Sequence, residues 1–241
     1  MTAPNPDHPL IWTRPERPRT RREPLTRERI VRAAIELADE RGLEGLSTRA
    51  IAARLGSGPT SMYWHVPTQA DLYELIVDQA IGEVPLLDSP SGDWRADMRH
   101  LAHGALAMFT RHPWLSLLGI QPGIGPHSRR YGEFAVDVMI AAGVDDDTAI
   151  QATAIINNYV IGFAQRRAAW RQLKDRVGPN QDLDARLNQY LAELEVSDPS
   201  LAEHFRTRSR LTDDANFNLG LDCVLEGIAT QLLTPHSRFI H

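Results

Sequence analysis

Apolar side chains recur at helical spacing through most of the chain. Between Thr26 and Gly42 they stand at positions 30, 34, 37 and 38, which lie on one face of a helix with 3.6 residues per turn. Thr26 suits the N-cap of this helix, because its hydroxyl can accept a backbone N–H of the first turn, and Gly42 suits its end. No segment alternates apolar and polar residues as a half-buried strand does. The pattern therefore predicts an all-α protein.

Two shorter helices are predicted next, with a glycine-containing turn of about four residues between them. Ser47 or Thr48 caps the first of them, which ends at Gly56. The second begins at Pro59, whose missing N–H costs nothing in a first turn, and it ends before Pro67. In a helix-turn-helix of this form, one helix crosses the DNA backbone and the next enters the major groove.

The remaining helices are bounded by capping residues, prolines and glycines. Thr68 with Asp71 three residues later resembles a capping box, and it opens a fourth amphipathic helix. Further helices are predicted over 94–111, 114–120, 127–142, 146–173, 182–194, 199–208 and 213–233. The helix from 146 to 173 is apolar nearly all round, which predicts burial on more than one side.

Three parts follow from this pattern. Residues 1–25 are predicted to be a flexible basic arm, 26–82 a helix-turn-helix DNA-binding domain, and 93–241 a helical ligand-binding and dimerisation domain. The arm contains six prolines and five arginines before residue 25, a composition that cannot build a packed core. Two interpretations of the arm stay open, one in which it lies on DNA phosphates or in a minor groove and one in which it is a solvated tail.

Charge is distributed unevenly along the chain. Residues 1–54 hold 11 arginines and 8 acidic residues, a net charge of +3, whereas the remainder has a net charge of −8. Because phosphate contact requires local and not global positive charge, the basic N-terminal end favours one DNA-facing end on an acidic body.

Other functional classes find little support. No run approaches the roughly 18 apolar residues of a membrane span, and no secretory signal precedes the first helix, so a cytoplasmic location and no membrane partner are expected. No phosphate-binding glycine loop or nucleophile elbow is present, which argues against an enzyme. His100 and His103 lack further ligands at suitable spacing, so neither a metal nor a cofactor is expected. The single cysteine, Cys223, is predicted to be a small buried hydrophobe.

One stretch of the sequence resembles the tetracycline-repressor (TetR) family. Between positions 42 and 72 it reads Gly-Leu-Glu-Gly-Leu-Ser-Thr-Arg-Ala-Ile-Ala, then Leu-Gly, then Met-Tyr-Trp-His-Val. The resemblance covers about 50 residues well and the helical body weakly. It implies a three-helix N-terminal DNA-binding domain, a homodimer on double-stranded operator DNA, and a small-molecule effector.

The resemblance also implies which residues meet DNA. Arg49 is expected at a base edge, phosphate contacts at the start of the helix that it lies in, and methyl, hydroxyl and backbone contacts along the next helix. The set is Ser47, Thr48, Arg49, Pro59, Thr60, Ser61, Tyr63, Trp64, His65 and Gln69. Gln69 departs from the family, whose members usually carry a lysine there. In the alternative interpretation Tyr63 and Trp64 are core aromatics and His65 only ends the helix.

The C-terminal part is expected to hold the effector and the partner subunit. Candidate pocket residues combine aromatic walls with a few polar groups, namely Leu101, Ala105, Phe109, Trp114, Asn157, Asn158, Arg166 and Trp170. Gly220 and Gly227 lie seven residues apart on the last helix, a spacing that suits close approach by a partner helix or, alternatively, packing within the chain. The predicted function is a ligand-responsive regulator, namely a repressor released from a palindromic operator by a small apolar or amphipathic molecule. A constitutive regulator without a ligand, an activator and an all-helical enzyme are the alternatives.

Overall fold

The computed structural model describes residues 25–118, 123–177, 189–190, 192–193, 195–203 and 213–233, and within these ranges it contains helices and no strand. The predicted arm over 1–25 lies almost wholly outside the described residues, as do most of the helix predicted over 182–194 and the end of that predicted over 199–208. The chain divides into two compact units. The first comprises Met1–Pro85 with Ala107–Glu133, and the second Leu86–Leu106 with Phe134–His241.

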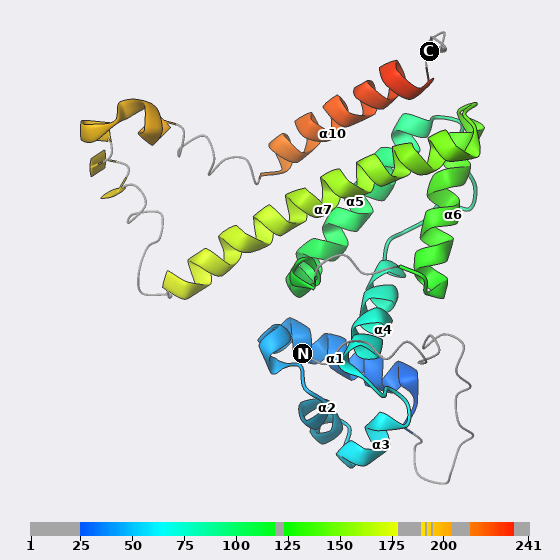
Figure 1. The fold of residues 1–241 in the computed structure, drawn as a ribbon, viewed down its shortest axis with the longest axis vertical. Coiled ribbons are helices and arrows are strands. Elements are labelled where there is room, and N and C mark those ends of the chain that lie inside the picture. Colours follow the sequence, from blue (N-terminus) through cyan, green and yellow to red (C-terminus); the bar gives the residue numbers. More distant parts are fainter. Residues whose placement is uncertain are drawn as a thin grey trace, which may run out of the picture. The chain divides into compact units, whose positions relative to one another are not determined.

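The first unit begins with four helices, α1 (Arg27–Arg41), α2 (Thr48–Arg54), α3 (Pro59–Tyr63) and α4 (Gln69–Ile81), with the short 3-10 helix η2 (Leu43–Gly45) between the first two (Figure 1). The predicted caps are confirmed, because the hydroxyl of Thr26 accepts the N–H of Arg29 and that of Ser47 accepts the N–H of Ala50. Thr68 and Asp71 form the predicted capping box. The most deeply buried side chains of its core, each at most 2% exposed, include Ile30, Leu37, Ile51, Met62 and Ile76.

Residues that follow the fourth helix by more than twenty positions complete this core. They come from the end of α5 (Trp94–Arg111) and from the 3-10 helix η3 (Pro113–Leu117), and Met108, Trp114 and Leu115 belong to the same hydrophobic cluster as α1 and α4. Asp39 of α1 accepts hydrogen bonds of 2.7 Å from the Trp114 indole N–H and from Nδ1 of His112. The helix-turn-helix is therefore packed against a segment that the linear domain boundaries assign elsewhere.

A buried carboxylate joins α4 to the start of α6 (Pro126–Ala141). Asp78 is 3% exposed, and it accepts the N–H and the hydroxyl of Ser128 at 2.8 Å each and the N–H of His127 at 3.3 Å. Three donors compensate for the removal of this charge from water, and they also satisfy N–H groups that have no partner within the first turn of α6. Burial raises the pKa of nearby Tyr131 in the same helix to about 12.

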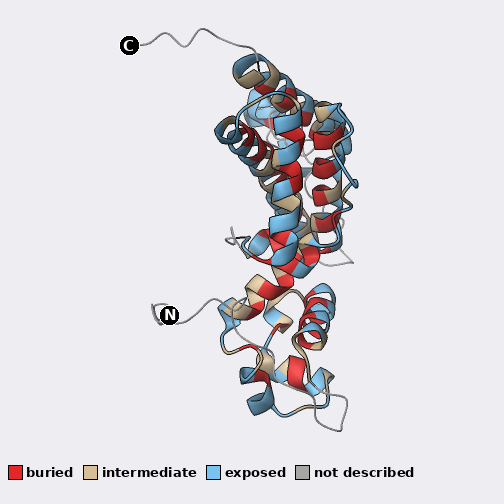
Figure 2. Cartoon of the chain, turned by 90° about the vertical axis from the view of Figure 1, so that its right-hand side faces the viewer, coloured by how far each residue is buried: buried red, intermediate tan, exposed pale blue. Residues whose placement is uncertain are grey.

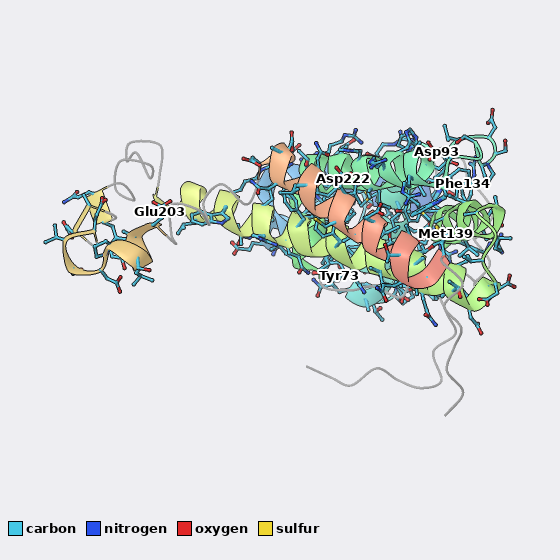
Figure 3. All side chains as sticks on the ribbon, turned by 90° about the horizontal axis from the view of Figure 1, so that it is seen from above. Tyr73, Asp93, Phe134, Met139, Glu203 and Asp222 are labelled. Atoms are coloured by element: carbon cyan, nitrogen blue, oxygen red, sulfur yellow. The ribbon has the colours of Figure 1, made fainter. Side chains whose placement is uncertain are left out.

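The second unit is built from the first part of α5, the later part of α6, α7 (Asp146–Val177) and α10 (Asp214–Ile228), which continues as a π-helical turn over Ala229–Leu233. Helix α10 runs alongside α7 (Figure 1). It buries Phe217, Leu221 and Leu225 completely or nearly so. Two exposed ion pairs tie α10 to α5, Arg95 with Glu226 at 3.3 Å and Arg99 with Asp222 at 2.8 Å (Asp222 is labelled in Figure 3).

Gly220 packs against a helix of its own chain. A Cβ built at Gly220 would lie 2.2 Å from the Tyr159 hydroxyl oxygen, so only glycine permits this approach of α10 to α7. The Tyr159 hydroxyl donates a 2.8 Å hydrogen bond to the carbonyl of Phe217, and burial raises its pKa. The expectation that Gly220 faces a partner is therefore wrong, whereas nothing within 4 Å meets a Cβ built at Gly227.

Two predictions of burial in the second unit are also wrong for the single chain. Cys223 is exposed, because Phe217, Leu221 and Leu225 occupy the inward face of α10 and the position of Cys223 points away from it. On α7, Ile150 and Ile155 are 56% and 45% exposed, although the sequence predicts burial on more than one side of this helix. Periodicity identified the apolar faces correctly but could not show what covers them.

Candidate DNA-binding surface

Helix α3 exposes nearly all of its side chains. Met62 is its one buried residue, whereas Thr60 and Ser61 are exposed and Tyr63 and the following Trp64 are 55% and 65% exposed. In Figure 2 the short helices of the first unit carry buried residues on one side and exposed ones on the other. The interpretation of these two aromatics as core residues is therefore excluded. An amphipathic aromatic surface on so short a helix is available to a partner.

The turn between α2 and α3 fixes how α3 is presented. Gly56 has a φ of 61°, in the left-handed region that glycine adopts without strain, and the N–H of Ser57 donates to the carbonyl of Ala52 at 2.9 Å. Pro59 occupies the first turn of α3, as predicted. The single buried side chain Met62 then anchors the helix to the core, so its other faces stay outside.

The first turn of α2 is exposed on the side opposite to its buried residues. Ile51 and Ala52 are 0% and 1% exposed, and they hold α2 in the core. Ser47 and Arg49 are exposed and Thr48 is half-buried. Within the part of the chain that the structure describes, Arg49 makes no ion pair, so its guanidinium is available for another acceptor.

A groove of about 300 Å³ brings together four of the residues that the sequence predicts at DNA. Apolar side chains of α3, α4 and the adjoining turns form part of its lining, and hydroxyl and amide groups form the rest. The lining consists of Leu46, Ser47, Thr48, Met62, Tyr63, Val66, Thr68, Gln69 and Leu72. It contains four hydroxyl groups and no lysine or arginine. Hydroxyls beside the N-terminal end of a helix are suitable donors to a phosphodiester.

Gln69, the departure from the family pattern, is engaged inside its own helix. Its side-chain amide donates a 2.6 Å hydrogen bond to the hydroxyl of Tyr73, one turn along α4. Asp71 adds a carboxylate that accepts the N–H of Thr68 at 3.1 Å. The start of α4 is therefore polar but contributes no positive charge.

Six predicted residues do not line the groove. Arg49 lies in α2, and the other five, Pro59, Thr60, Ser61, Trp64 and His65, lie along α3 and the turn after it. His65 is half-buried, and its carbonyl accepts a 3.3 Å hydrogen bond from Nε of Arg27, at the start of α1. The sequence analysis did not predict this role of Arg27, because the contact joins positions 38 residues apart and no local sequence pattern indicates it.

An exposed ion-pair network holds α2 against α1. Arg54 contacts Glu40 at 2.5 Å and Glu36 at 3.4 Å. The Arg54 hydrogen bond lowers the pKa of the Glu40 carboxyl, and the same contact raises the pKa of Arg54. Arg54 is therefore occupied within the protein, in contrast to Arg49.

The structure divides the eight candidate effector residues between the two units. Phe109 and Trp114 belong to the first unit, where Trp114 donates its indole N–H to Asp39. The other six belong to the second unit. Leu101 and Ala105 are buried, Asn157 and Trp170 half-buried, and Asn158 and Arg166 exposed. Their role in binding an effector stays a prediction.

Among the residues that the structure describes, no group of three or more histidine, cysteine or acidic side chains is arranged to hold a metal ion. In those same ranges, no helix combines the length and apolar character needed to cross a bilayer.

Two family models match the chain. The model for tetR-family bacterial regulatory proteins matches residues 30–76, and that for the tetracyclin repressor-like C-terminal domain matches residues 85–232. An HTH-type transcriptional regulator of Saccharopolyspora erythraea is 33% identical over 220 residues, with 91% of each chain covered. The HTH-type transcriptional repressor DrrR1 of Streptomyces coeruleorubidus is 32% identical, covering 91% of this chain and 83% of the relative.

Solved structures show the same arrangement of helices. The crystal structure of ActR, a TetR family protein of Streptomyces coelicolor in complex with actinorhodin, superposes with a TM-score of 0.69 at 25% sequence identity. The match covers 87% of this chain and 97% of that one.

Proposed function

The chain belongs to the tetR family of bacterial regulatory proteins, and from that premise we propose that it is a homodimeric repressor that leaves its palindromic operator when a small apolar or amphipathic molecule binds. It is a DNA-binding transcriptional regulator and not an enzyme. The observation that supports the proposal best is the exposure of Tyr63 and Trp64 on a helix anchored by Met62 alone. We propose that it acts on DNA in the cytoplasm.

Base recognition rests on Arg49 and on α3. An arginine that bonds guanine through both nitrogens discriminates against other bases by about 1–3 kcal/mol. Pro59 and the methyl group of Thr60 suit apolar contact with thymine methyls, and Ser61 offers a hydroxyl. The groove beside α3 takes a backbone phosphate, because the Ser47, Thr48, Tyr63 and Thr68 hydroxyls surround it.

The partner subunit packs on α7 and α10. Ile150 and Ile155 on α7 and Leu219 on α10 are large apolar side chains left exposed by the single chain. Cys223 and Gly227 beside them are small and exposed, which lets a second pair of helices approach closely. A second copy supplies two further apolar helices of this kind and gives the two-fold symmetry that a palindromic operator requires.

The effector acts by a difference in affinity between two dimer states. In the binding state the two α3 helices match successive major grooves, about 34 Å apart along the DNA. An effector that binds more tightly to a dimer state with another spacing lowers the affinity for the operator. The reduction is at most the ratio of the effector's affinities for the two states. The six candidate residues of the second unit are proposed to line its site, and the resemblance to an actinorhodin-bound neighbour supports a small-molecule site in this unit.

A footprint of the purified dimer on the DNA upstream of its own gene tests the proposal. The expected result is a protected inverted repeat that Arg49→Ala weakens by about tenfold or more, since one bidentate contact is lost in each half-site. Arg32→Ala, which removes an exposed arginine on α1, is the matched control and leaves the footprint unchanged. The proposal fails if the wild-type protein protects no site there and selects no palindrome from random duplexes.

A thermal-shift screen tests the effector part, with actinorhodin as the first probe. A ligand that binds only the native state raises Tm in proportion to the logarithm of its concentration. The expected molecule does this and also releases the operator. If a broad panel of apolar and amphipathic compounds shifts neither Tm nor operator affinity, the constitutive alternative replaces this part of the proposal.

A further inference from the structure

His112 lies between two carboxylates that belong to different elements. It directly follows α5 and is the N-cap of η3, and it is 3% exposed. Its Nδ1 lies 2.7 Å from Oδ1 of Asp39 on α1, and its Nε2 lies 3.2 Å from Oε2 of Glu83, two residues after α4. We propose that the doubly protonated ring is a pH-sensitive clasp that joins α1 and the end of α4 to the end of α5, and thereby positions the DNA-binding surface. This inference rests on the proposed function.

Both ring nitrogens need a proton for this arrangement. A neutral imidazole has one N–H and one lone pair, so it donates to one carboxylate only, and its lone pair faces the oxygen of the other. The cationic ring donates from both nitrogens, and hydrogen bonds between charged groups are the stronger ones. The contact with Asp39 is the shorter of the two, so we expect the neutral ring to keep its proton on Nδ1. Rising pH therefore releases Glu83 and leaves Asp39 bound.

Within the described ranges, three elements bring charged groups to this ring. Asp39 comes from α1, Glu83 from the turn after α4, and Arg111 of α5 pairs with the same Glu83 carboxylate. From η3, Trp114 adds a neutral donor, because its indole N–H bonds the same oxygen of Asp39 at 2.7 Å. With a cationic ring, two acids are matched by two cations, whereas a neutral ring leaves a net charge of −1. The cluster is therefore balanced only while His112 holds both protons.

The backbone on each side of the clasp is fixed by local hydrogen bonds. The N–H of His112 donates to the carbonyl of Met108 at 2.9 Å, and the carbonyl of His112 accepts the N–H of Leu115 at 3.0 Å. The N–H of Glu83 donates to the carbonyl of Ala80 at 3.0 Å, in the turn that ends α4. Loss of the Nε2 proton therefore changes the joint between these elements and leaves the elements themselves intact.

The two helices that the clasp holds also carry the DNA-binding surface. Helix α1 packs against both α2 and α4, and the start of α4 contributes Thr68 and Gln69 to the groove. Release of Glu83 removes one attachment of α4, so more of its freedom must be lost again when DNA binds. Operator affinity is therefore expected to be highest while the clasp is closed, and to fall as pH rises and the ring gives up its Nε2 proton.

The first experiment measures operator affinity of the full-length protein from about pH 6 to about pH 9 at constant salt. The duplex is one that the wild type selects from a random library. Wild-type Kd is expected to rise about fivefold or more over this range, since a charge-assisted hydrogen bond is lost. His112→Gln has no titrating ring, and its affinity is expected to match the weaker wild-type value throughout. The difference between the two proteins isolates His112, because His65 and the other histidines titrate in both.

A second variant separates the charge of the clasp from its packing. In Glu83→Gln the side-chain amide accepts from a protonated Nε2 through its oxygen and donates to an unprotonated one through its nitrogen, so the joint persists in both forms. We expect this variant to keep its affinity at the upper pH, where the wild type loses it. Glu133→Gln is the matched control, since Glu133 is an exposed acid of α6 that also pairs with an arginine, Arg129. Its pH dependence is expected to equal that of the wild type.

The histidine ring can also be observed without DNA. Nitrogen-15 spectra are expected to show a ring with two protons at the lower pH and one at the upper, identified as the ring whose signals change in Glu83→Gln. One proton at every pH overturns the clasp, even if His112→Gln fails to fold. So does a Glu83→Gln protein with wild-type pH dependence, although operator binding then stands. A wild type that selects no duplex overturns the proposed function instead, and the spectra still test the clasp.

Discussion

Helices α3 and α10 both expose large apolar side chains, yet they are surrounded by different groups. On α3, Tyr63 and Trp64 stand among the hydroxyls of Thr60 and Ser61. On α10, Leu219 is exposed beside Cys223 and Gly227, which are small and nearly apolar. Exposure alone therefore does not identify a partner. The polarity of the neighbouring side chains is the better guide, and it supports the proposals that α3 contacts DNA and that α10 contacts a second subunit.

The largest effect is expected on the inward side of α10. Phe217 is fully buried and contacts the rings of His103, Tyr159 and Phe163. Phe217→Ala removes these contacts and leaves a cavity, which lowers the free energy of unfolding by about 3–5 kcal/mol. Urea denaturation followed by circular dichroism measures the loss. A loss below about 1 kcal/mol would mean that α10 is not held by this cluster.

The next effect concerns the outward side of the same helix. Leu219→Asp places a charge where the partner subunit is proposed to pack, and we expect the dimer Kd to rise about thirtyfold or more, or about 2 kcal/mol. The monomer keeps its stability, since this side chain is 64% exposed. Sedimentation measures the dimer, and Asp222→Asn on the side facing α5 is the control. An unchanged dimer would place the subunit contact elsewhere.

A smaller effect is expected on α3. Tyr63→Phe removes one hydroxyl from the groove, and a hydrogen bond to a charged phosphate contributes about 1.5–3 kcal/mol. Operator affinity should fall about tenfold while Tm stays within a degree, and fluorescence anisotropy with a labelled duplex measures the change. Equal losses of affinity and stability would show that Tyr63 supports the fold and not the DNA contact.

The smallest effect concerns the ion pair between α1 and α2. The hydrogen bond from Arg54 lowers the pKa of Glu40, so the folded state binds the proton less readily than the unfolded chain. Its contribution is complete above the ordinary glutamate pKa, roughly 4.3, and is lost as pH falls through the lower folded value. Urea midpoints of wild type should therefore fall toward those of Glu40→Gln below that pH. If the urea midpoints of wild type and Glu40→Gln change in parallel with pH, the exposed Arg54–Glu40 pair does not stabilise the first unit.

Local sequence signals predicted the helix caps and the turn of the helix-turn-helix in the first unit. Thr26, Ser47 and Thr68 cap the helices at which they were expected, since a hydroxyl and the first-turn N–H groups are close in sequence. The turn at Gly56 and the exposed α3 follow from glycine and proline chemistry in the same way. Each of these capping and turn contacts joins neighbours along the chain.

Contacts between distant positions could not be predicted. The Gly220 contact with Tyr159 and the Trp114 bond to Asp39 join residues 61 and 75 positions apart, and neither leaves a periodic pattern. Periodicity also predicted that Cys223 and Ile155 lie on apolar helix faces. It could not predict which element, if any, covers those faces. A single sequence shows which faces must be covered, and the structure is needed to show whether the chain itself covers them.

The anchoring of the segment after α5 in the first unit sets a rule for building hybrid regulators. A graft that exchanges residues 26–82 alone would separate Asp39 from Trp114 and His112, and it would also strip Met108 and Leu115 from the core around α1 and α4. A transplanted DNA-binding domain must therefore include residues 107–133. Otherwise, the surface that these residues cover must be redesigned for the recipient protein. Spatial contacts, and not a continuous stretch of sequence, define the exchangeable unit of this protein. A boundary chosen from the linear sequence would divide one packed core.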